Sequence, residues 1–112
     1  MSKTRQDIQF KVLAILVGGQ VGTDPSAEDA STIDGYIDSQ VAELNADGTV
    51  YIADPDDLDD GLFMEFCKLV ANAAADEFGG QSNEQIGQQL RNRVRVIARQ
   101  QPGYGPQQVV YF

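Results

Sequence analysis

The segment from about residue 57 to residue 78 constrains the fold most, because it is apolar almost all the way round when it is drawn as a helix. Only a narrow polar stripe interrupts it. The apolar side chains are Leu62, Phe63, Phe66, Cys67, Leu69, Val70, Ala73 and Ala74, and the stripe is Glu65, Lys68, Asn72 and Asp76. A helix of this kind is stable only when other elements cover it, so it is predicted to be the most buried helix.

Three further segments have apolar residues at helical spacing and can supply that cover. They run over residues 4–17, 25–45 and 82–100. The side chains expected to face the core are Ile8, Val12, Ile15 and Leu16; then Ala30, Ile33, Ile37, Val41 and Leu44; then Ile86, Leu90, Val94 and Ile97. The second of these helices carries acidic residues on its other face.

Helix starts and stops are marked by specific residues. Asp24 is a good N-cap for the second helix with Pro25 at its first position, and Ser82, three residues before Gln85, forms a capping box for the last helix. Glycine pairs at residues 18–19 and 79–80 end the first and third helices. Gly87 inside the last helix costs about 1 kcal/mol relative to alanine.

The connection between the second and third helices has turn chemistry. Asp47-Gly48 predicts a turn, and residues 49–52 form a short β-prone run before the helix breaker Asp54-Pro55. With 112 residues, the chain makes one domain. We therefore predict an all-α fold, a small four-helix bundle with a short loop insertion and an extended C-terminal arm. Residues 1–101 form the helical domain and residues 102–112 form the arm.

The arm contains the most strand-prone residues of the chain, Val109, Val110, Tyr111 and Phe112. Everything upstream is predicted to be helix or loop, so the arm has no strand of its own to join, and a chain end is usually frayed unless something holds it. An extended segment with apolar anchors can add to a partner's sheet edge or lie in a partner's groove. The arm therefore indicates an assembly protein.

Charge excludes several classes of function. Seventeen acidic and eight basic residues give a net charge of −9, with no histidine. A chain this acidic does not grip DNA or RNA through its overall field. Without histidine, an acyl-transfer triad lacks its usual base, and no glycine loop with a following lysine is present to cradle phosphate. We expect no enzyme activity and no cofactor.

The single cysteine and the N-terminal sequence indicate the cellular compartment in which the protein is made. Cys67 lies in an apolar stretch, where a thiol most often serves as a small hydrophobe, and one cysteine forms no internal disulfide. The basic N-terminus lacks the apolar length and cleavage pattern of a signal peptide. No segment is long enough to span a membrane, so we expect a product made in the cytoplasm with no membrane partner.

Acidic and basic residues are sorted along the chain. Residues 18–60 hold twelve carboxylates and no lysine or arginine, whereas Arg91, Arg95 and Arg99 form one row on the last helix. The row can pair with the acidic second helix inside the monomer, as exposed charges commonly do. Alternatively, it is an inter-subunit surface that meets the acidic face of a neighbouring copy, a head-to-tail contact that closes into a ring when the rotation allows. Both interpretations stay open.

The acidic loop also invites a calcium interpretation. Aligned on Asp47-Gly48, an EF-hand loop would take Glu43, Asn45 and Asp47 as ligands and end at Asp54, but both end ligands are the wrong acid. Loop charges and charges at helix N-termini are the simpler explanation. We expect no metal site.

Several stretches together resemble the small head-to-tail adaptor proteins of tailed bacteriophages. They are PSAEDA at residues 25–30, DGYIDS at 34–39, DGTVYIADP at 47–55, ANAAADEFG at 71–79, and Tyr104 with VYF at 110–112. The resemblance covers nearly the whole chain. The tail differs in having Gly103 and Gly105 where bulkier or charged residues are expected after the proline.

The resemblance implies a structural virion protein in the phage neck, a homo-oligomer that assembles as a twelvefold ring beneath the portal. In such families the C-terminal segment commonly docks on the portal protein, and the lower face receives tail or nozzle proteins. Carried onto this chain, the portal-docking residues are Tyr104, Gln107, Gln108, Val109, Val110, Tyr111 and Phe112.

An acidic channel wall would repel phosphate and let duplex DNA pass without specific binding, whereas a basic wall would trap it. The candidate channel-facing loop comprises Asp54, Asp56, Asp57, Asp59 and Asp60.

Two other functions fit parts of the sequence. One is a small acidic regulatory or scaffolding module that binds one protein partner through the C-terminal arm. The other is an acidic mimic of DNA, which explains the charge but leaves the arm without a role. Stoichiometry separates the first from an adaptor, because an adaptor forms or joins a ring while a regulator binds as a monomer or dimer.

Overall fold

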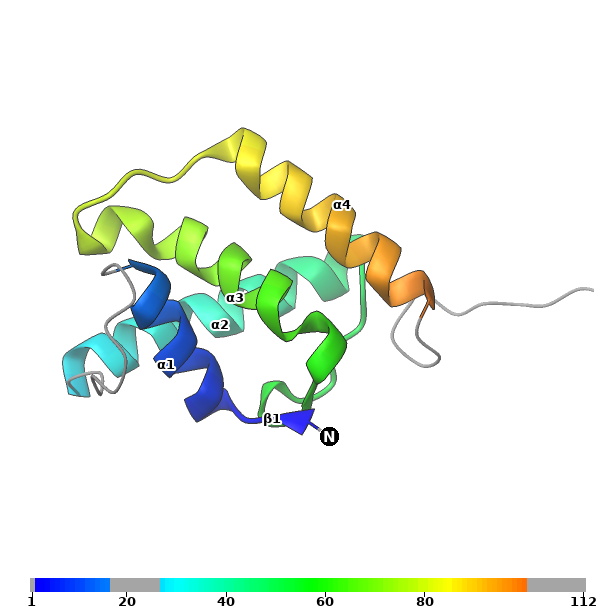
Figure 1. Ribbon diagram of the computed structural model, residues 1–112, viewed down its shortest axis with the longest axis horizontal. Helices are drawn as coiled ribbons and strands as arrows, with labels where there is room; N and C mark the ends of the chain where they lie inside the picture. Colours follow the sequence, from blue (N-terminus) through cyan, green and yellow to red (C-terminus); the bar gives the residue numbers. More distant parts are fainter. Residues whose placement is uncertain (1, 17–26, 101–112) are drawn as a thin grey trace, which may run out of the picture.

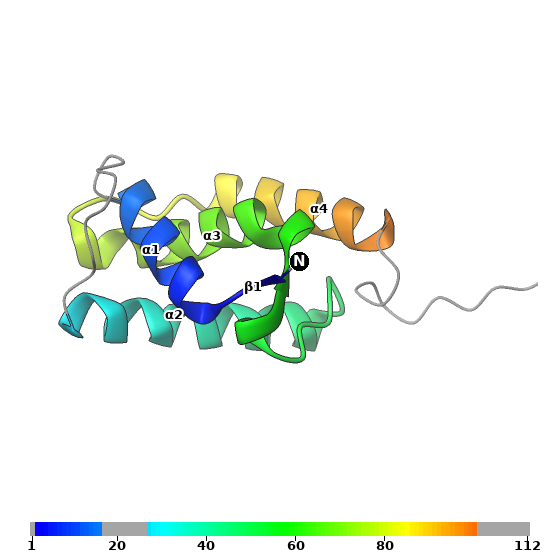
Figure 2. The ribbon, with the colours of Figure 1, turned by 60° about the horizontal axis from the view of Figure 1, so that its bottom comes forward.

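The third helix is the centre of the fold, as its apolar surface predicts. The computed structural model describes residues 2–16 and 27–100. Within them, helix α3 (Asp60–Ala74) packs against α1 (Arg5–Leu16), α2 (Ala27–Asp47) and α4 (Glu84–Gln100) (Figure 1). Turned by 60°, the bundle shows α2 in one layer and α3 with α4 in the other (Figure 2). The predicted all-α four-helix architecture is confirmed.

Burial of α3 explains this arrangement. Eight of its side chains are buried, and Phe66 and Val70 are almost completely inaccessible. Full burial of side chains of this size contributes about 1.5–3 kcal/mol each. The core cluster extends from Ile8 in α1 to Ala98 in α4, so all four helices contribute to one core.

The ends of the third helix differ from the prediction. A helix was expected over residues 57–78, but the chain forms a 3-10 turn η1 (Pro55–Asp57), a short strand β2 (Leu58–Asp59), then α3, and a second 3-10 turn η2 (Ala75–Phe78). Asp59 caps α3, because its carboxylate accepts a hydrogen bond from the Gly61 N–H at 3.0 Å. The predicted stop at residues 79–80 is confirmed, since η2 ends at Phe78.

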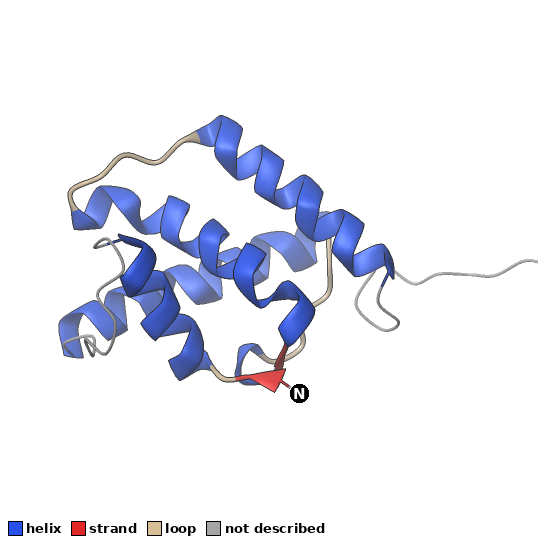
Figure 3. Ribbon diagram, viewed as in Figure 1, coloured by secondary structure: helices blue, strands red, loops and turns tan. Residues whose placement is uncertain are grey.

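A two-stranded ladder at the N-terminus was not predicted. Strand β1 (Ser2–Lys3) pairs antiparallel with β2, with Ser2 opposite Asp59 and Lys3 opposite Leu58 (Figure 3). The Lys3 ammonium lies 5.3 Å from the centroid of the Phe63 ring, a cation–π contact with α3. Two residues per strand are too few for an alternating pattern to be visible in the sequence.

Three predicted positions are wrong in detail. Ile15 and Ile86 were expected in the core but are 39% and 47% exposed. Leu13 and Ala98 are buried instead, on the sides of α1 and α4 that face α3. Glu65 was placed on the polar stripe of α3, yet it is 7% exposed because its carboxylate accepts a hydrogen bond from the Arg93 guanidinium at 3.1 Å.

The start of α4 is capped by a different residue from the one predicted. The Asn83 side chain, and not that of Ser82, accepts a hydrogen bond from the Ile86 N–H at 3.1 Å. The Asn72 carboxamide in α3 then holds both the N–H and the carbonyl of Asn83, each at 3.0 Å. A β-carbon on Gly87 would lie 3.2 Å from the Asn72 amide, so glycine permits this close approach. The predicted cap of α2 at Asp24 and Pro25 lies outside the described residues.

Residues 50–53 alternate between buried and exposed side chains, as a β-prone run would, but they join no strand among the described residues. Thr49, Val50 and Ile52 are buried, and Tyr51 is 61% exposed. The Asn45 carboxamide replaces a strand partner, because it accepts from the Ile52 N–H at 2.7 Å and donates to the Ile52 carbonyl at 3.0 Å.

This clamp leads to a stability prediction. Asn45→Ala leaves both backbone groups of buried Ile52 without their partners, which should lower the free energy of unfolding by about 1–3 kcal/mol. Urea unfolding followed by circular dichroism measures the change. Gln89→Ala, at an exposed position in α4, is the matched control and should stay within about 0.5 kcal/mol of the parent chain. Equal losses in the two variants would contradict the role of the clamp.

Candidate assembly interface

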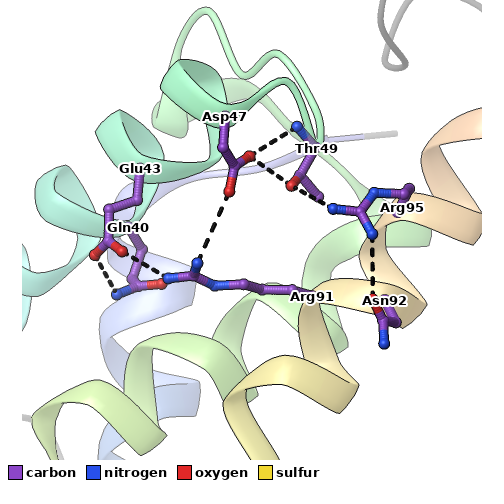
Figure 4. A network of polar contacts seen from close by, with 7 residues as sticks. All are labelled: Gln40, Glu43, Asp47, Thr49, Arg91, Asn92 and Arg95. Carbon is purple, nitrogen blue, oxygen red and sulfur yellow. Dashed lines mark hydrogen bonds and ion pairs between the residues drawn. The ribbon is translucent and has the colours of Figure 1, made fainter. Parts of the chain in front are cut away.

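Two arginines of the row on α4, Arg91 and Arg95, extend toward the C-terminal end of α2 and the turn that follows it (Figure 4). The Arg91 guanidinium lies 2.6 Å from the Glu43 carboxylate and 3.8 Å from the Asp47 carboxylate. Its side chain is 25% exposed. Arg91 therefore pairs with the acidic second helix inside the monomer, one of the two arrangements that the sequence allows.

Arg95 extends the same contact by one helical turn. Its guanidinium donates to the Thr49 hydroxyl at 3.3 Å and to the Asn92 side-chain oxygen at 3.2 Å. Thr49 is fully buried, and both its N–H and its hydroxyl donate to the Asp47 carboxylate. The carboxylate at the end of α2 thus links the turn that follows it to the arginines of α4.

The network changes the acidity of Asp47. The hydrogen bond from the Thr49 hydroxyl, the backbone hydrogen bond from Thr49 and the charges of Arg91 and Arg95 lower the pKa of Asp47 below its ordinary value of 3.8, against a smaller opposing effect of desolvation. The charged form of the carboxylate is therefore the one that the folded state favours.

Arg99 lies in the last turn of α4 and is exposed. No ion pair to it is seen within residues 2–16 and 27–100. Of the predicted inter-subunit row of Arg91, Arg95 and Arg99, the first two guanidinium groups are thus occupied inside the monomer. A contact of the row with a neighbouring copy stays a prediction.

The acidic loop residues have structural roles as caps. The Asp54 carboxylate accepts from the Asp56 N–H at 2.9 Å and caps η1. The Asp56 carboxylate accepts from the Arg5 N–H at 2.9 Å and joins the loop to α1. Asp57 and Asp60 are exposed, and their carboxylates make no hydrogen bond or ion pair with the described residues. These two side chains are available at the surface.

The side chains considered as calcium ligands make hydrogen bonds or ion pairs with other groups of the chain. Glu43 binds Arg91, Asn45 holds the backbone of Ile52, and Asp47 accepts from Thr49. All three ligand positions belong to α2, a helix and not a loop. Across the described segments, no three acidic, cysteine or histidine side chains gather as a metal site would require.

Cys67 is fully buried in α3, and burial raises the pKa of its thiol to about 12. The thiol is therefore neutral at physiological pH and behaves as part of the core, as its apolar neighbours in the sequence predict.

The predicted docking residues Tyr104, Gln107, Gln108, Val109, Val110, Tyr111 and Phe112 lie outside the described residues, as does the predicted arm as a whole. Sequence reasoning missed two surface features. One is Tyr51, which is exposed between buried neighbours, and the other is a groove bordered by Ile15 and Ile86. The signal for Tyr51 was its place between Val50 and Ile52 in a β-prone run, where alternate side chains point to opposite sides.

Comparisons with protein-family models, with curated proteins and with solved structures found no match for this chain. Among the helices of the described residues, none is both long enough and apolar enough to cross a membrane.

The Asp47 network leads to a prediction about acid stability. Because the pKa of Asp47 is lower in the folded than in the unfolded state, its contribution is present at neutral pH and is lost as the pH falls through the lowered pKa. Asp47→Asn should lower the thermal midpoint at about pH 6 and reduce the further fall between about pH 4 and about pH 2. Scanning calorimetry across this range measures both effects.

Asp57→Asn is the matched control, because the Asp57 side chain makes no such contacts with described residues. The pH dependence of this control should follow that of the parent chain. Parallel curves for Asp47→Asn and the parent chain would show that the network does not respond to pH.

Proposed function

We propose that the protein is a structural head-to-tail adaptor of a tailed bacteriophage, a ring between portal and tail through which DNA passes. The observation that carries the proposal is the resemblance of stretches spread from residue 25 to residue 112 to such adaptors. The all-α bundle is consistent with it, and two of the stretches lie on either side of α3. Residues 47–55 run from the end of α2 to the start of η1, and residues 71–79 run from the end of α3 through η2.

In the proposed function, the helical bundle is the folded body of the subunit and the C-terminal arm binds the portal protein. Among the described residues, one core cluster runs from Ile8 to Ala98 and draws on all four helices. Within the described residues, the only strands are β1 and β2, which pair with each other. In the proposed function the strand-prone residues 109–112 gain their partner on the portal protein.

Ring formation is the second part of the proposal. The subunits form a homo-oligomer, a dodecamer in the arrangement that the resemblance implies, located in the neck of the virion between portal and tail or nozzle proteins. The interface between copies is heterologous, because one surface of a copy meets a different surface of the next copy in a ring.

The acidic surface gives the passage of DNA a physical basis. Twelve carboxylates lie within residues 18–60, and those of Asp57 and Asp60 are exposed. A wall of negative charge repels the phosphates of the duplex, so DNA slides past without binding. Side chains that cap helices, such as Asp54 and Asp59, contribute to the same field while they hold the loop in place.

The proposal predicts a complex with the portal protein of the same phage. Full-length protein mixed with portal rings should add several copies per portal, in a ring visible by negative-stain imaging. Replacing residues 107–112 by an equally long Gly-Ser segment should weaken binding at least about tenfold, a loss of about 1.4 kcal/mol, because the apolar anchors are gone. Sedimentation measures the affinity.

Circular dichroism of the replaced chain is the control, and the docking role expects it to match that of the parent chain. Unchanged portal binding after the replacement would contradict the docking role. A complex with one or two copies per partner would instead fit the regulatory-module alternative.

The channel hypothesis predicts slower genome ejection after charge reversal of the acidic loop. Asp57→Lys with Asp60→Lys changes the charge of each subunit without removing the caps made by Asp54 and Asp59. If the loop lines the bore, added lysines attract phosphate and should slow ejection several-fold in low salt, with a smaller effect in high salt. Fluorescence of released DNA follows the rate.

Glu28→Lys with Glu84→Lys is the matched control. These two glutamates are exposed in the first turns of α2 and α4, and their reversal changes the charge by the same amount away from the loop. Equal ejection rates for the parent particle and the Asp57 and Asp60 variant would place the loop outside the bore.

A further inference from the structure

An apolar groove opens where α1, η2 and the first turns of α4 meet. It has a volume of about 390 Å³ and is lined chiefly by Ile15, Leu16, Phe78, Ile86 and Leu90, with the exposed Lys68 among the lining residues. The helical pattern predicts Ile15 and Ile86 in the core, but in the structure both side chains are exposed. Apolar hollows of this size take up side chains of a partner.

Tyr51 is a suitable occupant in its chemistry and its rigidity. It is the most exposed of the large apolar side chains in the described residues, at 61%. Its neighbours Val50 and Ile52 are buried, and the Asn45 carboxamide fixes the backbone of Ile52. Little backbone freedom is therefore lost when Tyr51 enters a partner, and tyrosine is one of the residues enriched at the energetic centres of interfaces.

Charges of opposite sign lie beside the two features. The segment that carries Tyr51 is followed by the exposed carboxylates of Asp54, Asp56 and Asp57, and the groove has the Lys68 ammonium among its lining groups. Opposite charges at the edge of an interface set its orientation and speed its formation more than they add to affinity.

Within one molecule Tyr51 does not contribute to the groove. The segment after α2 lies at the right of the bundle in Figure 1, and η2 with the end of α1 lies at the left. The groove extends from η2 to Lys68 in the middle of α3 and to Leu90 in α4, and Tyr51 is not among the residues that line it. Tyr51 therefore reaches a groove only on another copy, and such a contact is heterologous and repeats from copy to copy.

We propose that Tyr51 of one copy inserts into the α1–η2–α4 groove of the next, with its acidic neighbours near Lys68. The inference rests on the proposed ring-forming function and names the contact between its subunits. The contact is mainly apolar, so it differs from a contact made by the arginine row, which would weaken steeply as salt rises.

Disulfide trapping tests the contact with the full-length chain. Tyr51→Cys and Ile86→Cys are made as separate variants and mixed at high concentration in a glutathione redox buffer. Both sites are exposed, and the native Cys67 thiol is buried with a pKa raised to about 12, so it does not compete. The mixture should give a cross-linked dimer, and the double variant should give a ladder of larger products.

Val96→Cys is the matched control for the groove, because Val96 lies on the same helix, is 54% exposed and does not line the groove. Mixed with Tyr51→Cys, it should give at least about tenfold less cross-linked dimer than Ile86→Cys does. Equal yields from the two mixtures, or no dimer above the control, would overturn the proposal. So would a larger yield from Val110→Cys with Ile86→Cys, because the C-terminal segment would then be the occupant.

A second measurement avoids introduced cysteines. Tyr51→Ser should weaken self-association of the purified protein at least about tenfold by sedimentation, and an unchanged constant would overturn the inference. No portal protein is present in either experiment. If the wild-type protein joins a portal ring and Tyr51→Ser still self-associates with an unchanged constant, only the Tyr51 contact is refuted. If cysteines at positions 51 and 86 cross-link but the wild-type protein does not bind the portal, only the adaptor function is refuted.

Discussion

The burial of α3 between the other three helices determines where every other side chain of the bundle can lie. Leu62, Phe66 and Val70 fill the centre, and α1, α2 and α4 each turn an apolar face toward them. Replacing a buried phenylalanine such as Phe66 by alanine typically costs about 3–5 kcal/mol, a large part of the stability of a domain of this size. The polar contacts of the chain are arranged around this core.

Once α2 and α4 both pack on α3, their charged faces meet along one edge. The carboxylates of Glu43 and Asp47 then lie beside Arg91, and the turn after α2 is held by Thr49 and Arg95. Exposed ion pairs of this kind are individually worth about 0–1 kcal/mol. Their main effect here is positional, because they fix the end of α2 and the segment that carries Tyr51 relative to α4.

The sequence predicted the elements well where a strong pattern was present and failed where a single contact decided the outcome. The helix of residues 5–16 and the stop after Phe78 follow from periodicity and glycine pairs. Burial of Glu65 depends on Arg93, which is 28 residues away, and the cap at Asn83 depends on Asn72. No local pattern encodes such pairs, so propensity placed Glu65 on the surface and the cap at Ser82.

The same limit applies to the candidate interface. Helical spacing placed Ile15 and Ile86 in the core, but α1 and α4 diverge around η2 and leave both side chains at a groove. Partly exposed apolar residues that interrupt an otherwise buried stripe mark a surface that still has apolar area to bury. In a chain with a net charge of −9, copies repel one another at long range, so contact between them needs apolar burial at short range. In the contact that we propose, the exposed tyrosine of one copy and the groove of the next supply that burial.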